Sequence, residues 1–185
     1  AFIADREVDR RADLHLAPLD GSQPPLRLNP PFLLERGIAG ERGPGFLFTA
    51  DGTRIVYRAD QVTDLYTLFS VPVDGSAPPT ELTFPGTGRD VVEFAVTSTG
   101  RVVFTGDLRA DNGFELFSAP DDLSAPKVLL SGTFVAGGDV VSAGSGPSLR
   151  VEADGAHVVF SADKLVNEHV ELFRAALARL PRPTF

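Results

Sequence analysis

The chain has 185 residues, a formal net charge of −8, and no cysteine, methionine or tryptophan. The absence of cysteine excludes disulfides, thiol catalysis and thiolate metal sites. The acidic charge opposes binding to nucleic acid, and no apolar run approaches the roughly 20 residues that a membrane span needs, so we expect neither nucleic-acid binding nor membrane insertion.

The first predicted unit covers about residues 1–29 and holds three β-runs, at 1–5, 13–19 and 26–29. It lacks the leading strand that the later units have, so we expect further sequence upstream. Pro30 and Pro31 end the unit, because proline cannot donate a hydrogen bond to a strand ladder. A long, glycine-containing connection follows at residues 32–44.

The second unit covers about residues 45–83 and the third about 91–131, with a short connector between them. Each is divided into four short β-runs by turn residues such as Asp51-Gly52 and Asp74-Gly75, which supply the positive φ of tight turns. The expected runs are 45–49, 54–59, 66–73 and 80–83, then 92–97, 101–105, 114–119 and 127–130.

The fourth unit covers about residues 148–185 and follows a glycine-rich connection at 132–147. Its last strand is doubtful because Pro181 and Pro183 fall within it, and an outer edge strand tolerates one proline better than two.

Two sequence markers recur once per unit, and the spacings between their successive copies vary in parallel. Asp5, Asp60, Asp107 and Asp163 end the first long β-run of each unit, at spacings of 55, 47 and 56 residues. The Leu-containing start of the next run recurs at spacings of 54, 48 and 56 residues. A β-sandwich also has short alternating strands, but four self-similar units near 50 residues indicate propeller blades. We therefore predict an all-β propeller, or propeller segment, of about four four-stranded antiparallel blades in one domain, 1–185, with each first strand innermost.

The turn Thr49-Ala-Asp-Gly52, its counterpart Glu152-Ala-Asp-Gly155 and the run Leu68-Phe-Ser-Val-Pro-Val-Asp-Gly75 resemble the TolB-like, WD40-like (PD40) propeller repeats of bacterial exported proteins. The resemblance covers nearly the whole chain and is specific for fold rather than activity. It implies a periplasmic or extracellular location and a protein-binding scaffold, or the gating domain of a serine peptidase. TolB-like propellers have six blades, so four copies favour a segment of a longer propeller over a ring closed by four blades.

The acidic residues that recur with the repeat are better explained by turn hydrogen bonds than by calcium, which needs six to eight oxygens at one place. A second acidic series, Glu41, Asp90 and Asp139, precedes the first strands and is better placed than the first series to face a central channel. We favour a turn-capping role for this series as well. The three histidines share no metal-ligand spacing, and no nucleophile, base and orienting group can be assembled. We expect no catalytic residue, no cofactor and no metal ligand.

The function favoured by these observations is a non-catalytic protein-interaction module, and the alternative is the propeller portion of a larger hydrolase. The two long connections are the asymmetric features of an otherwise repetitive chain, and loops on a rigid scaffold are where binding usually resides. The candidate contact residues are Phe32, Arg42, Phe134 and Asp139. The incomplete terminal blades also offer a route to self-association.

The third β-run of each unit begins with the same motif, and Phe69, Phe117 and Phe173 follow its leucine. We predict that these rings pack between neighbouring sheets. His15 takes the equivalent place in the first unit.

Overall fold

The computed structural model describes residues 1–5, 11–32, 36–38, 45–61, 65–83, 90–109, 113–141 and 148–177. All regular structure in these ranges is β-strand. The described part of the chain accordingly contains no helix that is long and apolar enough to cross a membrane.

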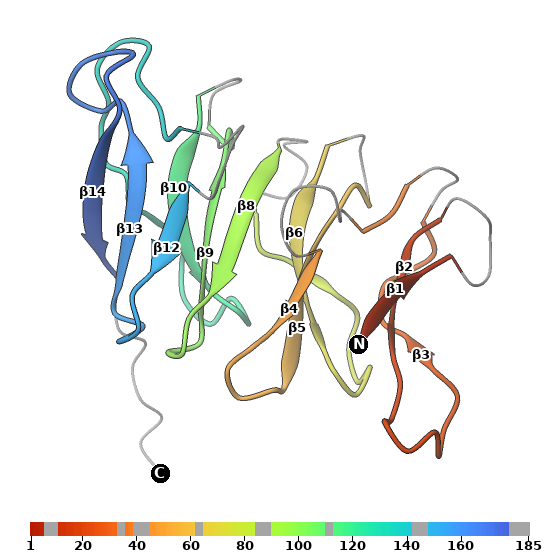
Figure 1. Ribbon diagram of the computed structural model, residues 1–185. Coiled ribbons are helices and arrows are strands. Elements are labelled where there is room, and N and C mark those ends of the chain that lie inside the picture. The colour runs from red at the N-terminus through yellow and green to blue at the C-terminus, as the bar shows by residue number, and fades with distance from the viewer. Residues whose placement is uncertain are drawn as a thin grey trace.

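Four antiparallel sheets follow one another along the chain, and Figure 1 shows them side by side, from the first at the right to the fourth at the left. The first sheet contains β1 (Phe2–Ala4), β2 (Asp13–Leu16) and β3 (Leu26–Arg27). The second contains β4 (Phe46–Phe48), β5 (Arg54–Ala59), β6 (Thr67–Pro72) and β7 (Thr80–Glu81). The third contains β8 (Val91–Val96), β9 (Arg101–Gly106), β10 (Glu115–Pro120) and β11 (Val128–Leu129), and the fourth β12 (Leu149–Val151), β13 (His157–Ala162) and β14 (Glu171–Ala176).

Within each sheet the strands pair in chain order, as in the blades of a propeller. The predicted fold class, an all-β propeller segment with antiparallel blades, is confirmed. The doubtful outer strand of the fourth blade lies outside the described residues.

The hairpins between the first two strands of the second, third and fourth blades turn on Gly52, Gly100 and Gly155, whose φ angles lie between 64° and 75°. Side chains with a Cβ rarely adopt this left-handed conformation. In two of these turns the preceding aspartate closes the loop, because Asp51 accepts the Thr53 N–H at 3.0 Å and Asp154 accepts the Ala156 N–H at 2.8 Å. The Asp-Gly pairs of the sequence are therefore turn determinants.

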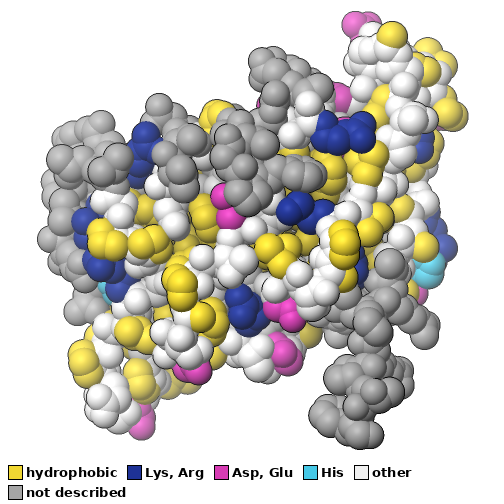
Figure 2. Space-filling view, turned by 180° about the vertical axis from the view of Figure 1, so that it is seen from behind, with side chains coloured by type: hydrophobic (Ala, Val, Ile, Leu, Met, Phe, Trp, Pro, Cys, Tyr) yellow, Lys and Arg dark blue, Asp and Glu magenta, His cyan; other side chains and the backbone are white. Residues whose placement is uncertain are grey.

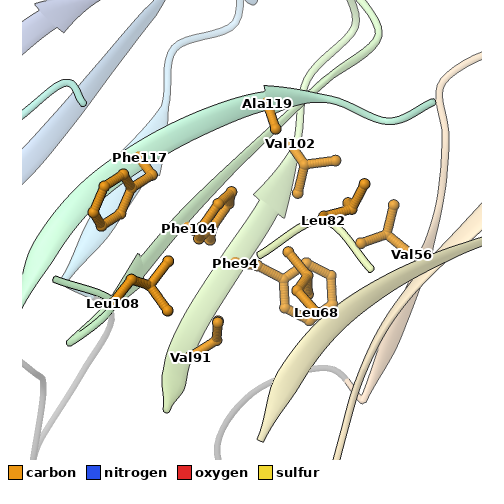
Figure 3. Packing of buried hydrophobic residues seen from close by; sticks show 10 residues of the cluster. All are labelled: Val56, Leu68, Leu82, Val91, Phe94, Val102, Phe104, Leu108, Phe117 and Ala119. Carbon is orange, nitrogen blue, oxygen red and sulfur yellow. The ribbon is translucent and has the colours of Figure 1, made fainter. Parts of the chain in front are cut away.

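The hydrophobic core is layered between the sheets, because successive side chains on a strand point to opposite faces. On β5, Val56 packs toward the third sheet, while Ile55 and Tyr57 pack toward the first. Figure 3 shows the layer between the second and third sheets, where Leu68 and Phe94 lie close together. A third layer joins the third and fourth sheets.

An aromatic pair recurs at the same register in every blade. The residues opposite each other on the two central strands are Tyr57 and Phe69, Phe104 and Phe117, and Phe160 and Phe173, with ring centroids 5.4 to 5.8 Å apart. In the first blade the pair is Phe2 and His15, with centroids 5.4 Å apart. The predicted register of the three phenylalanines is correct, and they pack against the layers between sheets.

The backbones of neighbouring sheets approach each other most closely at their first strands, where β4 lies close to β8 and β8 lies close to β12. Polar bonds reinforce this junction: Ser148 donates both its backbone N–H and its hydroxyl to Glu93 Oε2, at 2.7 Å each. The Thr99 hydroxyl also donates to the Gly155 carbonyl at 3.1 Å. These contacts support the expectation that the first strand of each blade is the innermost.

Candidate functional site

The two long connections run onto the blades in the same way. Ile38 forms an isolated antiparallel bridge with Ala59, and Val140 forms one with Ala162. The third blade has the equivalent pairing, Val91 with Gly106, at the start of β8, followed by a one-residue bulge. In the second and fourth blades the bridge residue is followed only later in the sequence by the first strand, β4 from Phe46 and β12 from Leu149, whereas in the third blade β8 continues past the bulge.

Backbone bonds show which positions are equivalent at this edge. The N–H groups of Asp60, Asp107 and Asp163 donate to the carbonyls of Gly37, Asp90 and Asp139, respectively. Asp90 and Asp139 thus belong to one series, but the corresponding residue of the second blade is Gly37. Glu41, which the sequence placed in the series, lies outside the described residues.

The carboxylates at these positions mainly hold the connections in place. Asp60 accepts the Gly37 N–H at 2.6 Å, and Asp90 accepts the Tyr66 N–H at 2.8 Å. Asp163 accepts the Asp139 N–H at 2.6 Å and the Glu168 N–H at 2.8 Å. This is the backbone-capping role expected from the sequence, although the donors lie partly in the preceding connection rather than only in the turn of the aspartate.

Asp139 and Asp163 lie close enough to influence each other. Burial raises the pKa of Asp139, and the negative charge of Asp163 raises it further. The two backbone N–H donors hold the pKa of Asp163 below its usual value. This edge of the fourth blade therefore carries negative charge on Asp163 in particular.

The candidate contact residues occupy different environments. Phe32 is only 4% exposed and belongs to the core between the first and second sheets, so it supports the fold rather than offering surface. Phe134 is half-buried and packs against the core between the third and fourth sheets. Asp139 is half-buried at the junction with Asp163, and Arg42 lies outside the described residues.

An exposed apolar surface lies beside Phe134 and Asp139, on the connection before β12 and the loop between β13 and β14. The two segments touch, because the Val135 N–H donates to the Lys164 carbonyl at 3.2 Å. Figure 2 shows hydrophobic side chains gathered on the corresponding projection at the upper right. The large exposed apolar residues, hereafter the apolar loop surface, are Val135, Leu165, Val166 and Val170.

This surface was not predicted from the sequence, although Leu165 and Val166 form an apolar pair inside a polar turn. Leu165 is 61% exposed and Val166 60% exposed. Adjacent exposed apolar residues on a projecting loop are typical of interaction sites. Negative charge on Asp163 and Glu168 flanks the pair in the sequence.

The opposite ends of the blades carry a second group of polar residues. Burial raises the pKa of Asp121 to about 6, and the nearby charges of Asp122 and Asp51 add to the effect. On the fourth blade, His157 Nδ1 lies 3.0 Å from Asp154 Oδ2 and 3.7 Å from Glu152 Oε2. Among the described residues, Glu152, Asp154 and His157 form the one group of three or more potential metal ligands.

This arrangement is that of a segment of a β-propeller, and its fold is similar to that of TolB proteins. TolB from Acinetobacter baumannii superposes with a TM-score of 0.52 at 12% identity, over 96% of this chain and 40% of that one. A protein described as a TolB from Agrobacterium tumefaciens gives a TM-score of 0.40 at 19% identity, over 64% of this chain and 40% of that one. This chain thus spans two fifths of the length of either neighbour, and the likeness concerns the fold.

No protein-family model matches the chain, and no curated protein matches it.

Proposed function

We propose that the chain is a non-catalytic protein-interaction module built from TolB-like (PD40) repeats within a larger exported bacterial protein. The observation that carries the proposal is the apolar loop surface, which is exposed on a blade whose other face is fixed by a hydrophobic layer. A rigid blade lowers the entropy that binding costs, because the loops are already held in position.

The surface favours a partner of particular chemistry. Leu165, Val166 and Val170 offer apolar area. The exposed Glu168 adds an acidic group beside it, whereas the buried Asp163 carboxylate accepts backbone N–H groups. The complementary partner is a protein that presents apolar side chains flanked by lysine or arginine. We include the connections at 32–44 and 132–147 in the proposed contact region, because long loops on a repetitive scaffold are where binding usually resides.

The test begins with affinity capture from an extract of the source organism, followed by titration of the purified captured protein. We expect Leu165→Asp to abolish binding, because it places a charge in the centre of the apolar contact. Leu19→Asp is the matched control: Leu19 is equally apolar and fully exposed, but it lies in the turn between β2 and β3.

Equal binding by Leu165→Asp and the unchanged chain would overturn the proposed contact. Hydrolase activity of the purified chain would overturn the non-catalytic assignment.

A further inference from the structure

We propose that Glu152, Asp154 and His157 form a binding site for a divalent first-row transition metal such as Zn²⁺, on the hairpin between β12 and β13. This inference is independent of the proposed protein-binding function, because the site lies at the other end of the fourth blade from the apolar loop surface.

The geometry of the three side chains suits a small metal ion. Ligands held about 2.0–2.1 Å from a tetrahedral metal lie roughly 3.3–3.4 Å from one another. The distances from His157 Nδ1 to Asp154 Oδ2 and to Glu152 Oε2, 3.0 and 3.7 Å, bracket that value. All three potential ligand atoms lie within 4.8 Å of one another. Small side-chain rotations would therefore bring them to coordination distance.

The hairpin holds two of the ligands on a defined backbone. Gly155 takes a φ of +64°, and the Asp154 carboxylate accepts the Ala156 N–H at 2.8 Å through Oδ1. This leaves Oδ2 directed at the histidine. One imidazole nitrogen with two carboxylate oxygens is a donor set that suits zinc, whereas calcium prefers oxygen ligands alone.

Arg174 orients the third ligand. Its Nε donates to Glu152 Oε1 at 2.6 Å, and its terminal nitrogen donates to Oε2 at 2.9 Å. A carboxylate oxygen has two lone pairs, so Oε2 can accept this bond and still bind a metal. Arg174 is thus a positioning residue, comparable with the hydrogen-bonding partners that orient ligands in other metal sites.

The repeat itself shows that this group is special to the fourth blade. At the positions of Glu152, His157 and Arg174, the second blade has Thr49, Arg54 and Ser70, and the third has Thr97, Arg101 and Ser118. In those two blades the arginine simply donates to the serine, at 2.8 and 2.6 Å. All three positions change in the fourth blade, and the arginine moves to the neighbouring strand. The changes together replace an arginine–serine bond with a set of metal-binding side chains.

The experiment is calorimetric titration of the intact chain with zinc chloride, and with calcium chloride as a second arm. We expect one zinc site, and calcium binding weaker by at least about a hundredfold. His157→Ala and Glu152→Gln should each weaken zinc binding by about tenfold or more, which corresponds to about 1.4 kcal/mol. His169→Ala is the matched control, because His169 is exposed in the loop between β13 and β14, at the opposite end of the same blade. This variant should change the affinity by less than about twofold.

Absence of zinc binding up to millimolar concentration would overturn the proposal. So would zinc binding that His157→Ala leaves unchanged, or calcium binding as tight as zinc binding. Thermal melts without metal show whether the variants remain folded; if His157→Ala does not, Glu152→Gln and the calcium arm decide the question.

Discussion

At the residue scale, burial depends more on the neighbouring sheet than on the local sequence. Leu68, Leu116 and Leu172 begin the same Leu-Phe motif, yet the first two are 0% exposed and Leu172 is 75% exposed. The first two face a following blade, whereas no described residue covers Leu172. Equivalent residues therefore contribute differently to stability.

The aromatic pairs provide a graded test of this idea. Phe117→Ala should cost about 3–5 kcal/mol of unfolding free energy, because Phe117 is 2% exposed within a core layer. Phe173→Ala should cost less, since Phe173 is only partly buried. Urea denaturation of both variants measures the difference, and equal costs would contradict the graded burial.

Asp121 gives stability a pH dependence of predictable sign. Its native pKa of about 6 lies above its unfolded value of about 3.9, so the folded state binds the proton more tightly. The stability that the folded chain gains by binding this proton more tightly is therefore fully present below about pH 4 and is lost as the pH rises through about 6. Asp121→Asn should stabilise the chain at pH 7 by about 1 kcal/mol, since partial exposure reduces the effect, and should lose that advantage below pH 4.

The matched control is Asp20→Asn, because hydrogen bonds from Ser22 lower the pKa of Asp20 and reverse the sign. Denaturation of both variants between pH 4 and 7 measures the two slopes. A stability gain from Asp121→Asn that does not change with pH would argue against a raised pKa.

At the scale of the elements, the blades are joined by a few polar bonds between innermost strands as well as by apolar layers. Glu93 on β8 accepts two bonds from Ser148, which precedes β12. A backbone N–H that loses its partner at a buried junction is costly, and Ser148 is buried.

Removing either partner should therefore give unequal effects. Glu93→Ala should destabilise the chain by about 1–3 kcal/mol, because it leaves both donors unsatisfied. Ser148→Ala should cost less, since its backbone N–H still bonds to Glu93. Chemical denaturation of the two variants gives the order, and a reversed order would show that the hydroxyl dominates the junction.

Most of the strand arrangement could be predicted from the sequence because its determinants are local. The Asp-Gly turns, the alternation of apolar residues and the repeat of about 50 residues indicate which segments pair. Aligning the copies of the repeat then predicts the register of the aromatic residues. The placement of Phe32 in the core could not be predicted, because its burial depends on how the first connection crosses onto the second blade. The proximity of His157 to Glu152 depends on the hairpin register, and the exposure of Leu165 depends on what covers the fourth blade.

At the scale of the whole molecule, the fourth blade exposes Leu172 on β14, and none of the described residues covers this face. We expect concentration-dependent self-association of the purified chain through this face. Leu172→Asp should shift the species toward monomer in sedimentation velocity, whereas Leu19→Asp should not. A strictly monomeric chain at all concentrations would contradict this prediction.

The most direct test of the interaction account is hydrogen–deuterium exchange of the chain alone and bound to its captured partner. The account predicts added protection at residues 133–141 and 163–172, with little change in the hairpins at 49–54 and 97–101. Protection confined to those hairpins, or to the first blade, would contradict the assignment of the binding surface to the loops of the fourth blade.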